Sequence, residues 1–447
     1  MLYTFIAAQN LNDNIMVPSG VVKLDLPRGM RDLEADEFAD ISFVRDRFVE
    51  TAKAFNFRLM EPSPLELLAT LEAKSGQAIS NEIYAFTDKG DREIALRFDL
   101  TIGLTRHVAL RRDLKMPAKL ASFAGVWRYD EPQAGRYRYF HQWDIEIYGP
   151  FSLESDAEAI EFVSSFFKRL GLKVTIQVND RQLIEQYINK KLEISDKETV
   201  LEMFRAVDKV PKKGAEVVLE EYSKSLDPAK LKMLIDLSKA SGTADQVADS
   251  ADVKGLEAWA NLIKLMDSLA ARKVQNVSVN LGIVRGLDYY SGIVFEAFEQ
   301  GSKAGALIGG GRYDRLTEAF GRKEIGATGV AGGVERIVMA LRNQGILKRQ
   351  ALPLVYVAYA AEEMKHRAIE LVSRIREEGI MTEYDLLGRP LRRQLDDASS
   401  KNARAAVIVA PQEFASNTLI VRSLADGKEE KVPVEKLRDA LNLILRA

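Results

Sequence analysis

Residues 119–148 read KLASFAGVWRYDEPQAGRYRYFHQWDIEIY, and this stretch decides how the fold is interpreted. Apolar and polar residues alternate on both sides of a loop that is rich in arginine, glycine and proline. Alternation with a period of two is typical of strands, so the stretch predicts an antiparallel hairpin with a basic tip. On its second strand, Gln142, Asp144, Glu146 and Tyr148 share one face because they lie two residues apart. Burying such side chains is costly unless something pairs with them, which indicates a polar ligand.

The stretches around this hairpin predict further helices and strands. Residues 34–55 and 155–171 carry apolar residues at helical spacing with charged residues between them, which predicts two amphipathic helices. Residues 93–104 alternate and then lead into a helix, while residues 174–178 and 277–299 have the character of strands. Together these patterns predict one domain in which helices and strands are mixed.

A change of composition marks a helical block inside this domain. Between residues 179 and 272 the pattern is helical, rich in lysine and glutamate, and poor in β-branched runs. We therefore expect a helical insertion at residues 179–272, which divides the domain into residues 21–178 and 273–350. Residues 1–20 precede it as an N-terminal extension of unknown role.

A second domain is expected at the C-terminal end. An Ala-Leu-Pro break at residues 351–353 predicts a boundary. After this break, strand and helix patterns alternate, which predicts a small α/β domain over residues 351–447 with a largely parallel sheet.

Composition excludes several classes of site. The chain has no cysteine, which excludes disulfides, thiolate metal sites and a cysteine nucleophile, and its three histidines argue against a histidine-built zinc site. The 63 basic and 65 acidic residues nearly balance, so a nucleic-acid surface must be a local patch. No signal peptide and no membrane span is recognisable, so we expect no membrane partner and a cytoplasmic location.

Three further stretches combine glycine with charged or aromatic residues. RGLDYY at residues 285–290 lies in front of a strand. A structural explanation, in which Arg285 pairs with Asp288 and the two tyrosines are interfacial aromatics, accounts for this stretch as well as a functional one does. GGGRYDRL at residues 309–316 lacks the spacing of the phosphate-binding and dinucleotide-binding loops and is interpreted as a tight turn. In GVAGGVERIV at residues 329–338, Glu335 suits a helix N-terminus, whereas Arg336 does not and calls for an anionic ligand.

Taken in this order, these stretches resemble the class II aminoacyl-tRNA synthetases, and their specific residues are similar to the histidyl-tRNA synthetase family. WRYDEPQAGRYRYFHQWDIEIYG resembles motif 2, GVAGGVERIVMAL resembles motif 3, and residues 34–64 resemble motif 1, which lies at a dimer interface. RGLDYYSGIVFEA and GGGRYDRL resemble the two histidine-specific signatures. The resemblance implies an α+β fold: a homodimer with an antiparallel-sheet catalytic core, a helical insertion and a C-terminal α/β anticodon-binding domain.

The resemblance also implies a histidine–tRNA ligase. Such an enzyme activates histidine with ATP to histidyl-adenylate and pyrophosphate, then transfers histidine to the 3′ end of tRNA(His). ATP is a substrate accompanied by Mg²⁺, and no metal ligand is assigned to a protein side chain. Two anions meet in the first step, and arginines that remain charged and bind oxyanions bidentately suit it. By resemblance, the catalytic arginines are Arg128, Arg285 and Arg336.

The resemblance assigns the remaining site residues by substrate. Those expected to bind histidine are Asp99, Thr101, Arg128, Gln142, Glu146, Arg285, Tyr289 and Tyr290. Those expected to bind ATP are Arg128, Asp130, Arg136, Phe140 and Arg336. Those expected to bind tRNA are Arg389, Arg392 and Arg393, although a solvated helix face explains these three equally well.

Two alternatives remain. A noncatalytic regulatory relative would share the fold, but such relatives usually lose the motif arginines, and Arg128, Arg285 and Arg336 are all present. A sister synthetase for proline, threonine or glycine would share motifs 2 and 3, but not Glu146 together with RGLDYY.

Overall fold

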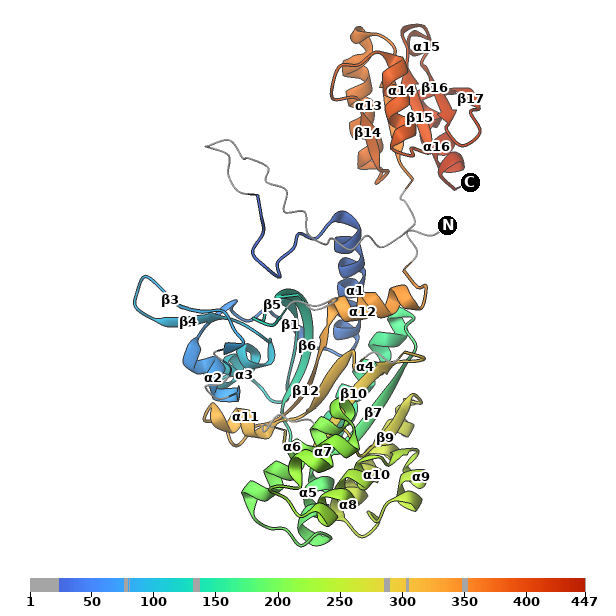
Figure 1. Ribbon diagram of the computed structural model, residues 1–447. Helices are drawn as coiled ribbons and strands as arrows, with labels where there is room; N and C mark the ends of the chain where they lie inside the picture. The colour runs from blue at the N-terminus through green and yellow to red at the C-terminus, as the bar shows by residue number, and fades with distance from the viewer. Residues whose placement is uncertain are drawn as a thin grey trace. The chain divides into compact units, whose positions relative to one another are not determined.

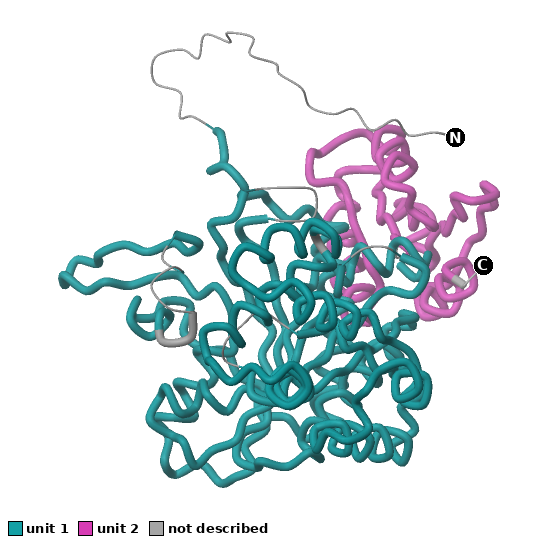
Figure 2. The backbone as a smooth tube through the Cα atoms, turned by 60° about the horizontal axis from the view of Figure 1, so that its bottom comes forward, with its two compact units in different colours: residues 1–347 teal, residues 348–447 magenta. Residues whose placement is uncertain are grey.

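The computed structural model describes residues 24–75, 79, 81–131, 137–284, 290–302, 305–347 and 353–446 of the chain (Figure 1). The chain divides into two compact units, residues 1–347 and 348–447, which Figure 2 colours separately. Among the helices in these ranges, none is both long enough and apolar enough to cross a membrane.

The larger unit is built on one sheet, which has nine strands within the described ranges and the order β1-β5-β6-β12-β11-β10-β7-β9-β8. In that order the strands are Arg58–Leu59, Ala118–Trp127, Tyr139–Gly149, Gly326–Gly333, Ile308–Arg312, Ile293–Glu299, Val174–Asp180, Val277–Asn280 and Ser241–Gly242. All pairings from β5 to β7 are antiparallel, while β1 pairs with β5 and β9 with β7 in parallel. The hairpin predicted over residues 119–148 is confirmed as β5 and β6.

Helices cover the two faces of this sheet differently (Figure 1). One face packs on α1 (Ala35–Ala54), α4 (Leu153–Leu170) and α12 (Val334–Asn343) through a single large hydrophobic core. Phe48 of α1 is fully buried there, with its ring centroid 5.5 Å from that of Trp143 on β6. Phe38, which has the same helical spacing, is exposed instead.

The second face of the sheet is shared between apolar and polar groups. Its helices are α2 (Leu68–Ser75), α3 (Thr101–Leu110) and α11 (Asp314–Ala319), which contact one another. A separate three-stranded sheet of β2 (Leu65–Leu67), β4 (Glu93–Leu96) and β3 (Ala85–Thr87) belongs to the same unit. The predicted candidate residues of α3 and β6 lie on this second face.

The stretch between β7 and β9 is mostly helical. Its helices are α5 (Arg181–Lys190), α6 (Lys197–Lys213), α7 (Ala215–Tyr222), α8 (Pro228–Ser238), α9 (Ala244–Ser250) and α10 (Glu257–Ala271). Strand β8 interrupts them and forms the edge of the large sheet. The apolar residues of these helices belong to the same hydrophobic core as α1 and α4, so the block is built onto the sheet and has no separate core.

Two glycine-rich stretches contribute to strands, although the first of them, GGGRYDRL, was interpreted as a tight turn. GGGRYDRL supplies most of β11, and GVAGG supplies the end of β12. The glycines are needed because side chains of other strands lie across them: a Cβ at Gly310 would be 2.5 Å from Cζ of Phe295, and one at Gly329 would overlap Oε2 of Glu146. Glycine is rare in strands, but it allows this close approach.

The C-terminal unit contains a sheet of order β14-β13-β15-β16-β17, with strands Thr382–Tyr384, Val355–Tyr359, Ala405–Val409, Thr418–Ser423 and Glu429–Pro433. Its helices are η2 (Glu362–Met364), α13 (Lys365–Glu377), α14 (Leu391–Ser400), α15 (Pro411–Ala415), η3 (Val434–Lys436) and α16 (Leu437–Arg446). The first three strands are parallel, but β16 and β17 are antiparallel to their neighbours, so the expectation of a largely parallel sheet is wrong. The connections before β16 and β17 are too short for the crossover that a parallel pair requires.

Candidate active site

The polar face predicted for the second strand of the hairpin is buried in the middle of the large sheet. Gln142, Asp144 and Glu146 of β6 are 4%, 0% and 1% exposed. On β12, the residues directly opposite them are Gly333, Ala331 and Gly329. Because opposite residues of an antiparallel pair point to the same face, these small neighbours leave the polar side chains room to lie over the adjacent strand.

Asp144 joins Thr101 to Gln142. Thr101, the first residue of α3, donates from Oγ1 to Oδ2 of Asp144 at 3.0 Å. The Nε2 of Gln142 donates to Oδ1 of Asp144 at 2.9 Å. Asp99 is also buried, and its Oδ1 accepts the backbone N–H of Ile102 at 3.1 Å in the first turn of α3. The structure thus joins Thr101 and Gln142, two of the residues predicted to bind histidine, through the carboxylate of Asp144, which had no assigned role.

Arg128 extends this cluster toward the hairpin loop. Its Nη2 donates to Oε1 of Gln142 at 3.2 Å, and its Nε donates to the carbonyl of Phe98 at 3.1 Å. Its guanidinium also lies 5.0 Å from the centroid of the Phe140 ring. Arg128 and Asp144 together fix the amide of Gln142, since one partner needs its oxygen and the other its nitrogen.

Glu146 forms a second polar cluster on the same face. The hydroxyl of Tyr313, which follows β11, donates a short hydrogen bond to Oε2 of Glu146. Nearby, the Tyr148 hydroxyl lies 3.0 Å from Oγ1 of Thr105. Burial raises the pKa of Tyr148 and Tyr313 well above the usual value, and the charge of Glu146 raises both further. Both phenols therefore remain neutral donors at physiological pH.

Tyr290 packs beside this second cluster. Its side chain is 5% exposed and belongs to the same apolar group as Tyr148 and Tyr313. A Cβ at Gly311 would lie 3.0 Å from two carbons of the Tyr290 ring, so this glycine lets the ring rest on β11. Tyr290 and Glu146, both predicted to bind histidine, thus lie in one part of the molecule, because Tyr313 bonds to Glu146 and shares a cluster with Tyr290.

The structure adds two residues that sequence reasoning missed as site residues. Asp144 already stood out in the alternating pattern of β6, between two residues that were assigned. Tyr313 lies in GGGRYDRL, but its proximity to Glu146 depends on three strands being adjacent, β6, β12 and β11. No local pattern carries that information.

Glu335 and Arg336 begin α12 at the opposite end of β6. The Glu335 carboxylate accepts the backbone N–H of His141 at 3.0 Å and lies 3.1 Å from Nδ1 of the same residue. Glu335 therefore links α12 to β6, a role that the helix dipole alone does not explain. Arg336 is exposed, and a Cβ at Gly305 would lie 3.2 Å from its Nη2.

The predicted ATP residues of the hairpin loop are only partly described. Asp130 is half-buried, and its carbonyl accepts Nε of Arg138 at 3.1 Å. Arg138 also reaches the carbonyl of Arg28 at 3.2 Å, so it braces the base of the loop. Three predicted residues lie outside the described residues: Arg136, Arg285 and Tyr289.

The three arginines predicted to contact tRNA differ in their surroundings. Arg389 donates to Asp385 at 2.5 Å and to Asp397 at 2.8 Å, and these hydrogen bonds raise its pKa. Arg392 and Arg393 are exposed, and Arg393 is 4.0 Å from Asp396. A cavity of about 640 Å³ borders Arg389, lined by Arg376, Glu383, Tyr384, Leu386, Leu387, Asp397 and Lys401. Arg389 therefore has a structural task that Arg392 and Arg393 lack.

Comparison with known proteins identifies the family. A family model described as histidyl-tRNA synthetase matches residues 29–337, and one described as anticodon binding domain matches residues 354–442. A histidine–tRNA ligase of Pyrococcus furiosus is 32% identical over 429 residues, 94% of this chain and 99% of the relative. That of Pyrococcus abyssi is 33% identical over 430 residues, 93% and 99% of the two chains.

A solved structure supports the same conclusion for the fold. The histidyl-tRNA synthetase of Nostoc matches with a TM-score of 0.80 at 24% identity, covering 94% of this chain and 99% of its own. The expected fold, an α+β catalytic core followed by an anticodon-binding domain, is confirmed. With a family model over more than half of its length and relatives above 30% identity along nearly all of it, the chain belongs to the histidyl-tRNA synthetase family.

Proposed function

We propose that this chain is a histidine–tRNA ligase, which makes histidyl-adenylate from histidine and ATP and then esterifies tRNA(His). The observation that carries the proposal is the buried polar face of β6, where Gln142 and Asp144 form one cluster and Glu146 forms another. Histidine presents an ammonium group at one end and an imidazole at the other, and the two clusters match those two ends.

The cluster around Asp144 suits the ammonium group. Asp99, Thr101 and Gln142 would contact it, and Asp144 would add a buried negative charge close to two of them. A charge-assisted hydrogen bond in a buried site is stronger than one in water. The fixed amide of Gln142 keeps its oxygen toward Arg128, so the amino-acid carboxylate would lie on the arginine side.

The cluster around Glu146 suits the imidazole. Glu146 would accept an N–H from one ring nitrogen, Tyr290 would bond the other, and Tyr289 would pack beside the ring. The hydrogen bond from Tyr313 holds the carboxylate in place. A pocket that bonds both nitrogens rejects apolar analogues, because its own buried polar groups would then lack partners.

The arginines would stabilise the phosphates. In the first step, the histidine carboxylate attacks the α-phosphorus of ATP in line, and the bond to pyrophosphate breaks as the new acyl-phosphate bond forms. Arg128 and Arg285 would hold the α-phosphate and the carboxylate, while Arg136 and Arg336 would hold the outer phosphates. Phe140 and Asp130 would hold the adenine. Such preorganised cations act mainly by stabilising the charge that develops in the transition state.

We expect Mg²⁺ to accompany ATP. In the ranges that the structure describes, no three His, Asp or Glu side chains gather in a way that could hold a metal ion. Magnesium keeps several waters and often uses only one or two carboxylates besides the phosphates. The triphosphate itself would therefore be its main ligand, and the ion would neutralise part of the phosphate charge.

We further propose that the protein acts in the cytoplasm as a homodimer whose interface includes residues 34–64. Apolar side chains in and near this stretch are exposed: Leu59, Leu65, Leu67 and Phe86. A particle with the 50.0 kDa mass of one chain in light scattering would contradict the dimer. Within each chain, residues 21–178 and 273–350 would form the catalytic core, residues 179–272 the insertion, and residues 351–447 the tRNA-binding domain.

The decisive experiment is amino-acid-dependent exchange of pyrophosphate into ATP, run with each of the twenty amino acids, followed by charging of tRNA(His). Histidine alone should support exchange, and histidine should then appear on the tRNA. Exchange that responds to another amino acid and not to histidine would refute the proposal. Absence of exchange with every amino acid would instead support a noncatalytic relative.

A further inference from the structure

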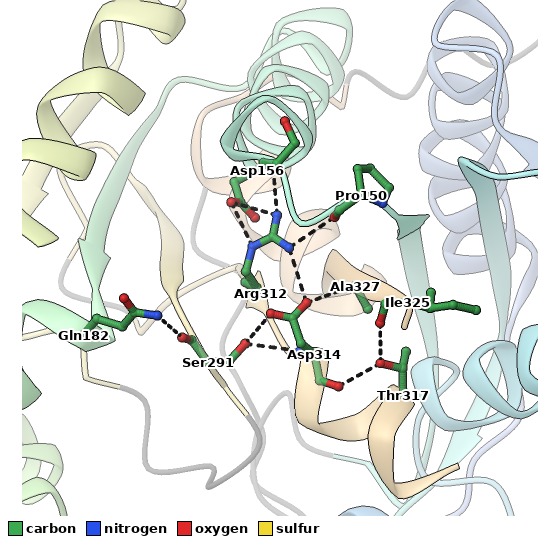
Figure 3. A network of polar contacts seen from close by, with 10 residues as sticks. Pro150, Asp156, Gln182, Ser291, Arg312, Asp314, Thr317, Ile325 and Ala327 are labelled. Carbon is green, nitrogen blue, oxygen red and sulfur yellow. Dashed lines mark hydrogen bonds and ion pairs between the residues drawn. The ribbon is translucent and has the colours of Figure 1, made fainter. Parts of the chain in front are cut away.

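A network of polar contacts joins the strand that follows Tyr290 to the segment that carries Tyr313 (Figure 3). Ser291 is the residue after Tyr290, and Asp314 is the residue after Tyr313. The Oγ of Ser291 donates to Oδ2 of Asp314 at 2.9 Å and accepts the backbone N–H of Asp314 at 3.2 Å. Ser291 also donates its own backbone N–H to the carbonyl of Arg312 at 2.9 Å. Three hydrogen bonds thus tie the two segments together next to the tyrosines.

Asp314 is fixed by a second set of contacts on its other oxygen. Its Oδ1 accepts the backbone N–H of Ala327 on β12 at 2.8 Å and Nη1 of Arg312 at 3.3 Å. Its side chain therefore bonds to groups before β10, on β11 and on β12. An ionised carboxylate suits this position because every one of these partners is a donor.

Arg312 is held from the other side of the sheet. Its Nε and Nη2 donate to Oδ2 of Asp156 at 3.1 and 3.0 Å, and its remaining donors reach the carbonyls of Pro150 and Ser152. Figure 3 shows the guanidinium between Asp156 of α4 and Asp314. With all these bonds made inside the protein, Arg312 is an anchor for Asp314 and has no need of a ligand.

Ser291 has a further contact with α5. The Nε2 of Gln182 donates to the carbonyl of Ser291 at 2.9 Å, and the backbone N–H of Arg181 donates to the carbonyl of Gly292 at 3.0 Å. The backbone that leaves Tyr290 is therefore bonded on both edges. A displacement of Ser291 would be passed to Tyr290 through a single peptide unit.

We propose that Asp314 and Ser291 are positioning residues for the imidazole pocket, which set the spacing between Tyr290 and Tyr313. This inference rests on the proposed function. Neither side chain touches the substrate; each acts through the tyrosine that precedes it in the chain. An error of about 1 Å in a buried hydrogen-bonding site is enough to weaken binding strongly, because such sites rely on fixed geometry.

The inference predicts a defect confined to histidine. Loss of the Ser291 hydroxyl would loosen the tyrosines, while the ATP side of the site is held by Arg128 and the β5–β6 hairpin. A purely structural role would instead lower the active fraction, which changes the kcat for both substrates and leaves the KM values unchanged.

The test compares Ser291→Ala with Ser291→Thr, Asp314→Asn and the control Ser164→Ala in the pyrophosphate exchange assay. Ser164 is a matched control because it is also half-buried and also donates to a side chain, Oδ1 of Asn276 at 3.0 Å, and this bond is not one of the contacts of Ser291 and Asp314. We expect Ser291→Ala to raise the KM for histidine about fivefold, the usual effect of one lost hydrogen bond, and to leave the KM for ATP unchanged. Asp314→Asn should raise the KM for histidine further. Ser291→Thr keeps the hydroxyl and should have the KM for histidine of the unmodified enzyme.

Each outcome decides between the possibilities. Equal rises in KM for histidine and ATP, or a Ser291→Ala enzyme that behaves like Ser164→Ala, would overturn the positioning role while leaving the ligase function intact. Failure of the unmodified enzyme to use histidine would overturn the proposed function and this inference with it.

Discussion

Strand β6 of the larger unit and strand β13 of the C-terminal unit both lie inside their sheets, but they bury different chemistry. β6 buries Gln142, Asp144 and Glu146, whereas β13 buries only Val355–Tyr359, a run of apolar residues and two tyrosines. In the C-terminal unit, Arg389 pairs with Asp385, which follows the edge strand β14, and with Asp397 of α14. Polar groups in the middle of a sheet are costly and therefore point to a ligand, whereas groups that satisfy one another at its margin point to architecture.

The strongest test of this contrast is Glu146→Gln. The change keeps the shape of the side chain but removes the charge that holds Tyr313 and would accept an imidazole N–H. We expect kcat/KM for histidine to fall about a hundredfold, as is usual when a buried charged hydrogen bond is lost. Pyrophosphate exchange measures the fall, and circular dichroism checks that folding is intact. Activity within a factor of two of the unmodified enzyme would mean that Glu146 has a structural role only.

The second test places a methyl group in the space over β12 that the side chain of Glu146 occupies. In Gly329→Ala the new methyl group would overlap Oε2 of Glu146, so the carboxylate must move or the strand must shift. Overpacking of this kind costs about 1–3 kcal/mol of folding free energy, and we expect a lower melting temperature together with a raised KM for histidine. Gly255→Ala is the control, because a Cβ at Gly255 meets no atom within 4 Å. Equal behaviour of the two variants would contradict the close packing of Glu146.

The third test separates two arginines of the C-terminal unit. Arg389→Ala leaves the buried Asp385 without its charged partner, so we expect a lower folding free energy in a denaturant titration. Arg393→Ala, at an exposed position, should leave stability unchanged and raise the KM for tRNA severalfold, with a weaker dependence on salt. If Arg393→Ala changes stability and not the KM for tRNA, its assignment to tRNA binding is wrong.

The smallest effect is expected at Asp180, a buried carboxyl of the large sheet that serves architecture. Its Oδ1 caps α5 by accepting the backbone N–H of Gln182 at 2.9 Å. Burial raises the pKa of Asp180 to about 7, and the charge of Asp156 adds to this. Because the folded state holds the proton more tightly than the unfolded chain, the group lowers stability as pH rises from its unfolded pKa of about 4 to about 7.

Asp180→Asn should therefore stabilise the protein at pH 8, by on the order of 1 kcal/mol, and should do so less at pH 5. Asparagine keeps the oxygen that caps α5, so the cap is retained. Thermal melts at the two pH values measure the difference. A variant that is less stable at pH 8 than the unmodified protein would show that the ionised carboxylate is needed there.

Local patterns predicted much of the fold and the polar strand face on which the candidate site is built. The alternation of residues 119–148 is a property of neighbouring residues, and it correctly gave the hairpin and the polar face with Gln142 and Glu146. The prediction of a tight turn at the glycines of β11 was wrong, because glycine favours turns and only the side chains of other strands explain its place in a sheet. The bond between Tyr313 and Glu146 and the bonds between Ser291 and Asp314 could not be predicted, since both depend on which strands become neighbours. The strands β16 and β17 depart from the predicted parallel sheet because the connections before them are too short for a crossover.

The glycines of β11 and β12 also limit how this site can change. Every substitution of glycine adds atoms, and at Gly311 and Gly329, on the face of Tyr290 and Glu146, another residue already lies within 3.0 Å of where the first added carbon would be. Mutation from this side can make the pocket smaller but never larger. An enzyme that accepts a bulkier amino acid would have to shorten Glu146 or the tyrosines, the groups expected to recognise histidine. A single substitution would then both widen the substrate range and remove selectivity for histidine. A gradual change of specificity to another amino acid is therefore difficult for this enzyme.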